Sequence, residues 1–151
     1  MLRDDKLSKF GEGPWVDEAD RLEFEACGLP CLITRNPLLG TMCGYVAVPP
    51  GHPLHGVSYR VASAALDVHG GVNYSQRCDD EVCHKAKPGE PDDVWWFGFH
   101  CACGWDLLPY MSKWLGCPRD GHGDLQNYRD LNFVRVECES LAVQLAALVP
   151  Q

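Results

Sequence analysis

The chain has 151 residues, of which 46% are hydrophobic and 23% charged, a composition typical of one globular domain rather than of a disordered or fibrous protein. Its 21 acidic residues outnumber the 13 Lys and Arg, and the formal charge of −8 argues against a protein that coats a polynucleotide. No apolar run reaches the roughly 18 residues of a membrane-spanning helix, and the N-terminus lacks the apolar segment of a secretory signal. We therefore expect a cytoplasmic protein with neither a membrane nor a polynucleotide as partner.

The first third of the chain predicts an arm followed by strands. Residues 1–19 are polar, which predicts a loosely attached N-terminal arm anchored by Trp15, before a single domain over 20–151. Charged and apolar side chains alternate over 21–26, the pattern of a half-buried strand. A turn at 28–30 and a returning strand over 31–34 complete a hairpin. A third strand is expected over 42–48, ending at prolines that cannot donate to a ladder.

The middle of the chain contains the most strongly predicted strand. A rigid loop with two histidines is expected over 49–56, a short helical turn over 58–65, and a strand over 65–74 interrupted by two glycines. An exposed loop over 76–93 leads to VWWFGFH at 94–100, which is aromatic and β-branched. Alternation places residues 95, 97 and 99 on the core side of this strand and His100 on the opposite side.

The C-terminal segment predicts a long helix. After a turn at 101–106 and a loop at 116–124, apolar residues recur at steps of three and four, with Asp130 as N-cap and Pro150 as stop. The stripe comprises Leu131, Val134, Cys138, Leu141, Leu145 and Leu148. Strands followed by one long helix predict an α+β fold, with a mainly antiparallel sheet and the helix packed on one face.

Histidine and aspartate recur where the predicted strands end. Asp67 and His69 are two residues apart on one predicted strand, and the glycines that follow allow close approach of a ligand. His100 and Asp106 flank the turn after the aromatic strand. We predict that these four residues converge in a catalytic pocket, which requires His69 and His100 to share a face of the sheet. The alternative is a surface aspartate, a hydrogen-bonded histidine and a β-bulge.

Five further residues are candidates for ligand binding. His52 in the proline-stiffened loop and the aromatic Trp96 are expected to roof the pocket. Arg60, Tyr128 and Arg129 could bind an anionic group. Each of these three is, taken singly, also typical of an ordinary surface residue.

The nine cysteines are numerous and odd in number, so complete disulfide pairing would leave one thiol. Those expected in the core are Cys27, Cys31, Cys43 and Cys138, whereas Cys117 and His122 flank a polar loop without a predicted role. Cys78 and Cys83, next to His84, could join Cys101 and Cys103 in a structural zinc site, although the spacing matches no standard signature. The alternative is that these cysteines are buried as small apolar side chains.

Four stretches stand out together: GYVAVPPGHPLHG (44–56), LDVHGGVNYS (66–75), WWFGFHCACGWD (95–106) and YRDLNFVRVECESLAVQL (128–145). They resemble a family of small proteins of bacteriophages and prophages, especially phages of actinobacteria, over most of 42–148. The resemblance implies action in the cytoplasm of an infected bacterium. Members typically read GFDCAH with a later Asp, so here His100 stands in place of an Asp and Cys103 in place of a His.

Three classes of function remain open. The first is a small hydrolase of a nucleotide or other phosphate ester, with or without a divalent metal such as zinc. The second is a non-catalytic protein that sequesters a nucleotide-like ligand in counter-defence, with a homo-oligomer as one way to build its pocket. The third is a module that binds a host protein. The sequence contains no G-x-S-x-G, P-loop, Rossmann or H-E-x-x-H motif, so those enzyme classes have no support.

Overall fold

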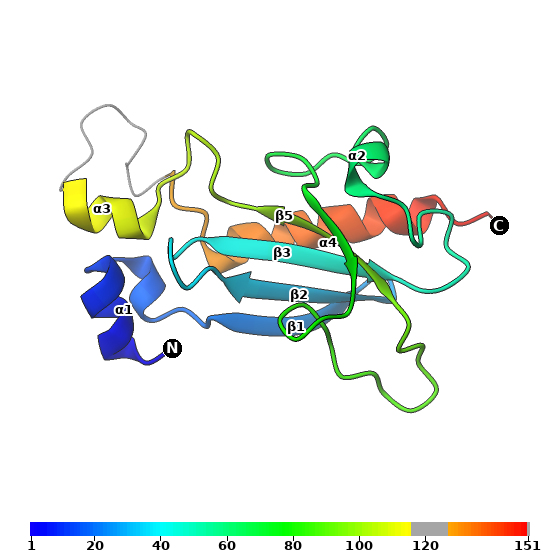
Figure 1. Cartoon of the computed structure of the whole chain (residues 1–151), viewed down its shortest axis with the longest axis horizontal. Helices are drawn as coiled ribbons and strands as arrows, with labels where there is room; N and C mark the ends of the chain where they lie inside the picture. Colours follow the sequence, from blue (N-terminus) through cyan, green and yellow to red (C-terminus); the bar gives the residue numbers. More distant parts are fainter. Residues whose placement is uncertain (116–126, 151) are drawn as a thin grey trace.

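The computed structural model describes residues 1–115 and 127–150 and confirms the predicted α+β class. The strands form one five-stranded antiparallel sheet. Figure 1 shows a long helix lying across this sheet. In spatial order the strands are β1 (Arg21–Ala26), β2 (Leu29–Arg35), β3 (Met42–Val48), β5 (Trp95–His100) and β4 (Tyr74–Arg77). The helices are α1 (Arg3–Phe10), the 3₁₀ turn η1 (Pro14–Val16), α2 (Tyr59–Ala62), α3 (Pro109–Leu115) and α4 (Leu131–Ala147).

The predicted hairpin forms between β1 and β2, with a tighter turn than expected. Ala26 pairs with Leu29, so the loop consists of Cys27 and Gly28, with φ of 52° and 75°. Two successive residues with positive φ are typical of a type I′ turn, whose twist matches that of the flanking strands. Pro30 accordingly belongs to β2 and pairs with Glu25 of the outer strand.

The helix α4 covers one face of the sheet, as its apolar stripe predicts. Asp130 caps it by accepting a hydrogen bond from the backbone N of Phe133 at 2.8 Å. The core between helix and sheet is fully buried and includes Ile33, Val46, Phe97, Val134, Leu141 and Leu145. Gly44 makes this packing possible, because a Cβ there would overlap the Phe99 ring and the sulfur of Cys138.

The loop that follows β4 covers part of the opposite face. Val82 and Val94 pack there on Leu32, Ala47 and Trp96, and all five side chains are buried. This second, smaller core occupies the half of the sheet near the start of β5. The half near the end of β5 carries a pocket, described below.

The N-terminal segment is folded rather than loosely attached. Phe10, Trp15 and Val16 are buried together with Leu107 and Tyr128, and Trp15 anchors the segment as predicted. Its indole Nε1 donates to the carbonyl of Gly11 at 2.9 Å. Helix α1 packs against α3 at one end of the molecule (Figure 1).

One further prediction of local structure needs correction, and one helix was not predicted. The strand expected over 65–74 is wrong, because Gly70 and Gly71 adopt φ of 71° and 81° in a turn and β4 begins only at Tyr74. Helix α3 had no clear periodic signal and was not predicted. The loop expected over 116–124 lies outside the described residues.

Candidate functional site

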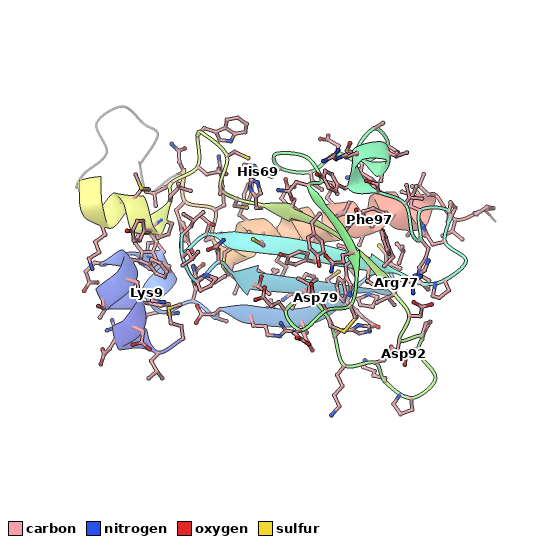
Figure 2. The ribbon with its side chains drawn as sticks, in the orientation of Figure 1. Lys9, His69, Arg77, Asp79, Asp92 and Phe97 are labelled. Carbon is pink, nitrogen blue, oxygen red and sulfur yellow. A yellow bond between two sulfur atoms is a disulfide. The ribbon has the colours of Figure 1, made fainter. Side chains whose placement is uncertain are left out.

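His69 and Asp106 meet beside the first turns of α4, as the sequence predicts for this pair. The imidazole Nε2 of His69 lies 2.8 and 3.0 Å from the two carboxylate oxygens of Asp106. An ionised carboxylate only accepts hydrogen bonds, so Nε2 carries the proton and the Nδ1 of a neutral ring is left as an acceptor. The ring of Phe133 packs edge-to-face on the imidazole at 5.2 Å and fixes its orientation. Figure 2 labels His69 in this position.

Asp106 joins three separate segments of the chain. Its side chain is fully buried and also accepts hydrogen bonds from Arg129 Nε and from the backbone N of Cys103, both at 2.9 Å. Burial opposes ionisation of Asp106, but the hydrogen bonds from His69, Arg129 and Cys103 outweigh it and lower the pKa of the carboxyl. The residue is therefore a buried, fully hydrogen-bonded carboxylate.

Cys103 lies beside this pair. Its sulfur, an imidazole nitrogen of His69 and a carboxylate oxygen of Asp106 are within 4.8 Å of one another, close enough to share a metal ion. Burial raises the pKa of the Cys103 thiol, and the negative charge of Asp106 together with a hydrogen bond from the thiol raises it further. The thiol is therefore protonated at neutral pH, which disfavours Cys103 as a nucleophile.

The predicted convergence of four catalytic residues is wrong, because Asp67 and His100 lie elsewhere. Asp67 precedes a turn rather than lying on a strand; it is exposed, and its backbone N and O pair with the side chain of Gln144. His100 shares a face of β5 with Trp96, whereas Phe99 faces α4. His100 therefore lies on the face of the sheet opposite the helix, away from His69.

Three of the predicted ligand-binding residues form internal contacts of the fold. His52 is buried, with Nε2 2.7 Å from the carbonyl of Leu145 near the end of α4 and Nδ1 accepting the backbone N of Leu54. Trp96 is fully buried in the core of the opposite face. The hydroxyl of Tyr128 accepts from Arg35 and donates to Glu18, which ties the N-terminal segment to the start of α4.

The two arginines differ in position. Arg60 is exposed on α2, where its guanidinium lies 5.8 Å from the ring centroid of Tyr59. Arg129 is the predicted ligand-binding residue that lies at the His69–Asp106 pair, and its guanidinium also packs over Phe133 at 4.9 Å.

The predicted zinc site of four cysteines is also wrong. Cys78 and Cys83 form a disulfide beside the start of β5, whereas Cys101 and Cys103 follow its end. A strand of six residues spans roughly 20 Å, so the two pairs cannot share one ion. Of the cysteines expected in the core, Cys31 and Cys138 are buried, Cys43 is half-buried and Cys27 is exposed in the hairpin turn. Cys117 and His122 lie outside the described residues.

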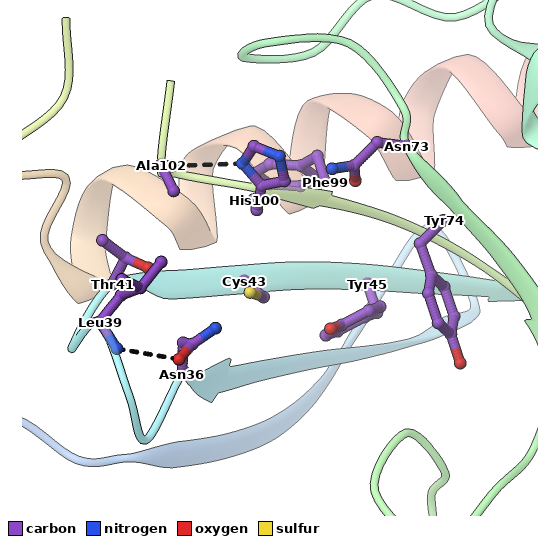
Figure 3. A pocket seen from close by; sticks show the side chains of 10 residues that line it. All are labelled: Asn36, Leu39, Thr41, Cys43, Tyr45, Asn73, Tyr74, Phe99, His100 and Ala102. Carbon is purple, nitrogen blue, oxygen red and sulfur yellow. Dashed lines mark hydrogen bonds between the residues drawn. The ribbon is translucent and has the colours of Figure 1, made fainter. Parts of the chain in front are cut away.

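His100 lines a pocket that the sequence did not predict (Figure 3). The cavity has a volume of about 340 Å³ and lies over β3 and β5 on the face opposite α4. Its lining comprises Asn36, Leu39, Thr41, Cys43, Tyr45, Asn73, Tyr74, Phe99, His100 and Ala102, none of them formally charged at neutral pH. The feature of the sequence that could have indicated this pocket is Gly98, a glycine in a strand of bulky residues. A side chain at this position would overlap the ring of its neighbour Tyr45.

The polar groups of this pocket have defined hydrogen-bonding roles. His100 Nδ1 accepts the backbone N of Ala102 at 3.2 Å, so the neutral ring has its donor at Nε2. The Asn36 side-chain oxygen accepts the backbone N of Leu38 and of Leu39, which leaves its NH₂ group as a donor. Burial, and then the neighbouring Asp79, raises the pKa of Tyr74 to about 12, so its hydroxyl is neutral at pH 7.

The fold and the pocket together define a small α+β domain with an uncharged cavity, lined by polar and apolar side chains, on the face of the sheet opposite α4. Comparison of this chain with protein-family models, with curated proteins and with solved structures found no match. Within the two described ranges, none of the helices is long and apolar enough to cross a bilayer.

Proposed function

We propose that this protein binds a small, neutral, polar molecule with a planar ring, of the size and chemistry of a nucleoside, and holds it without converting it. The observation that carries this proposal is the uncharged, hydrogen-bonding lining of the cavity of about 340 Å³. A concave site with a few oriented polar groups among apolar ones is the usual form of a small-molecule site.

The lining favours a neutral ligand over a phosphate ester. Among the described residues no Lys or Arg lines the cavity, and the chain carries a formal charge of −8, which repels anions. The donors at His100 Nε2 and at the Asn36 amide match the ring nitrogens and carbonyl oxygens of a heterocycle. Tyr45 and Tyr74, edge-to-face at 5.2 Å, add aromatic surface against which a planar ring can pack.

The position of the pocket favours retention over catalysis. His69 and Asp106, the pair best suited to proton transfer, are not among its lining residues. In the setting that the resemblance to phage proteins implies, such a pocket would lower the free concentration of a nucleoside-like signal.

Titration calorimetry with nucleosides and their 5′-monophosphates tests this proposal. We expect each bound nucleoside to bind more tightly than its monophosphate and to remain chemically unchanged on chromatography. His100→Phe, which removes the Nε2 donor, should weaken binding by about 10- to 100-fold, the equivalent of one unsatisfied hydrogen bond. His55→Phe is the matched control, because His55 contacts the carbonyl of Asp93 outside the pocket. Absence of nucleoside binding, or tighter binding of the monophosphates, would refute the proposal.

A second candidate, hydrolysis of a phosphate ester, is favoured by one specific observation. Asp106 holds the His69 ring with Nδ1 available as a base, and among the described residues no hydrogen bond uses the Nη groups of Arg129. Those Nη groups could hold phosphate oxygens. Chromatography of a nucleotide panel with added Zn²⁺, Mn²⁺ or Mg²⁺ should then show product, and His69→Ala should slow its formation by about 100-fold or more. A panel without any product would exclude this candidate.

A further inference from the structure

The loop after β4, which covers part of the sheet face opposite α4, brings together three side chains of types that bind metal ions. The sulfurs of Cys78 and Cys83 and an imidazole nitrogen of His84 lie within 4.8 Å of one another. The two sulfurs are joined in a disulfide, visible as a yellow bond in Figure 2. None of the three residues lines the pocket or contacts the His69–Asp106 pair, so the cluster has no part in the proposed function.

His84 is the unusual member of this cluster. Both of its ring nitrogens are buried, and neither has a hydrogen-bond partner among the described residues. Its ring packs edge-to-face on Trp96 at 5.6 Å. Buried polar atoms are nearly always hydrogen-bonded, because leaving one unpaired is costly. His84 is thus a buried imidazole that has no hydrogen-bond partner in the described part of the chain and lies beside two sulfurs. This arrangement points to a ligand that His84 and the sulfurs bind only when the disulfide is open.

We propose that reduction of this disulfide creates a site for a soft divalent cation, Zn²⁺, held by Cys78, Cys83 and His84. Two thiolates and one imidazole are a donor set that zinc prefers, and three protein ligands leave one tetrahedral position for solvent. His84 also lines a cavity of about 180 Å³. Trp96 supports the site from outside, because its Nε1 lies 3.2 Å from the Cys78 sulfur and donates to it.

Zinc binding requires the two cysteine sulfurs to move apart after reduction. Zn–S bonds of about 2.3 Å in a tetrahedral site place two sulfurs about 3.8 Å apart, so the cysteine side chains must separate after reduction. Residues 78–94 contain no helix or strand, although Val82, between the two cysteines, is buried against the sheet. A dithiol reductant transfers two electrons and two protons to the S–S bond and becomes a disulfide itself, and each thiol so formed releases one proton to solvent on binding the metal. The disulfide and the zinc complex are therefore mutually exclusive states of the same two sulfurs.

Cobalt substitution provides a direct test on the 151-residue chain. The protein is reduced under anaerobic conditions and titrated with Co²⁺, and Zn²⁺ is then added in competition. We expect one Co²⁺ per chain, with the visible and near-ultraviolet bands of tetrahedral cobalt bound to thiolates, and loss of these bands when Zn²⁺ displaces it. The oxidised protein should show none of these bands.

Single variants identify the ligands. Cys83→Ser should abolish the thiolate bands, and His84→Phe, which keeps a ring on Trp96, should weaken Zn²⁺ binding by about 100-fold or more in a chelator competition. Cys103→Ser is the matched control, because Cys103 belongs to a second group among the described residues that could hold a metal, and this variant should bind as the parent does. Circular dichroism confirms that each variant is folded.

Two outcomes of the cobalt titrations would overturn the proposal. If the reduced parent shows no tetrahedral cobalt bands, or if Cys103→Ser loses them while Cys83→Ser keeps them, then the 78–84 cluster is not a metal site. If His84→Phe does not fold, the comparison of Cys83→Ser with Cys103→Ser alone decides between these outcomes.

Discussion

Replacing Asp106 by Asn tests whether one buried carboxylate holds three segments of the chain together. The carboxylate accepts hydrogen bonds from His69 Nε2, Arg129 Nε and the backbone N of Cys103. An amide of the same shape keeps one acceptor oxygen but turns an NH₂ group toward one of these donors. Arg129 also loses its counter-ion, although its side chain is 22% exposed and can be partly hydrated.

The expected loss of stability follows from these contacts. A hydrogen bond to a charged group contributes about 1.5–3 kcal/mol, and at least one is lost in Asp106→Asn while the others become neutral. We therefore expect the free energy of unfolding to fall by about 3 kcal/mol at pH 7. For a chain of this length that corresponds to a decrease in Tm of about 6–12 °C.

The pH dependence of stability is an independent test of the contribution of the Asp106 carboxylate. Because the pKa of Asp106 is lowered in the folded state, its stabilisation is complete above the ordinary carboxyl pKa of about 3.9 and is lost as the pH falls through the lower folded value. The difference between parent and Asp106→Asn should thus be largest near neutral pH and shrink below about pH 4.

Urea unfolding followed by tryptophan fluorescence at several pH values measures both quantities. Asp93→Asn is the matched control, since Asp93 is exposed and lies 3.8 Å from Arg77, and its effect should be within about 0.5 kcal/mol. A loss for Asp106→Asn as small as that of the control, or one that does not change between pH 7 and pH 3, would show that the buried hydrogen bonds do not stabilise the fold as argued.

Two further predictions concern packing and thiol reactivity. Gly44→Ala should destabilise the protein by about 1–3 kcal/mol in urea unfolding, because the added methyl overlaps the Phe99 ring. Gly104→Ala is the control and should have little effect, because a Cβ there meets nothing within 4 Å. Equal losses of stability in the two variants would contradict this packing. The raised pKa of Cys103 should make its alkylation by iodoacetamide at pH 8 slower than that of a free thiol, and Asp106→Asn should accelerate it by removing the adjacent negative charge. Mass spectrometry of the peptide containing Cys103 measures the rate, and an unchanged rate in the variant would contradict the role assigned to Asp106.

Local patterns in the sequence were sufficient to predict the helices and strands that bury one face. The outer strand β1 of the hairpin follows from alternation at period two and the helix α4 from apolar steps of three and four, because burial of one face imposes that period on the chain. The strand β5 is buried on both faces and follows instead from its aromatic and β-branched residues. The side of β5 on which His100 lies follows from the same alternation. The pairing of His69 with Asp106 was expected from the clustering of these residue types near the ends of predicted strands.

Tertiary structure alone decided which residues share a site. Asp67 was placed beside His69 by assuming a strand, but the two glycines turn the chain, so the assumption of alternation fails there. The sequence suggested that Cys78 and Cys101 could bind the same metal ion, but the strand β5 separates them in the structure. Conversely, the pocket joins Asn36, Tyr45, Asn73 and His100 from distant parts of the chain. The physical reason is that periodicity reports which side of its own element a residue occupies, whereas a site depends on strand order and register, which arise from packing between elements far apart in the sequence.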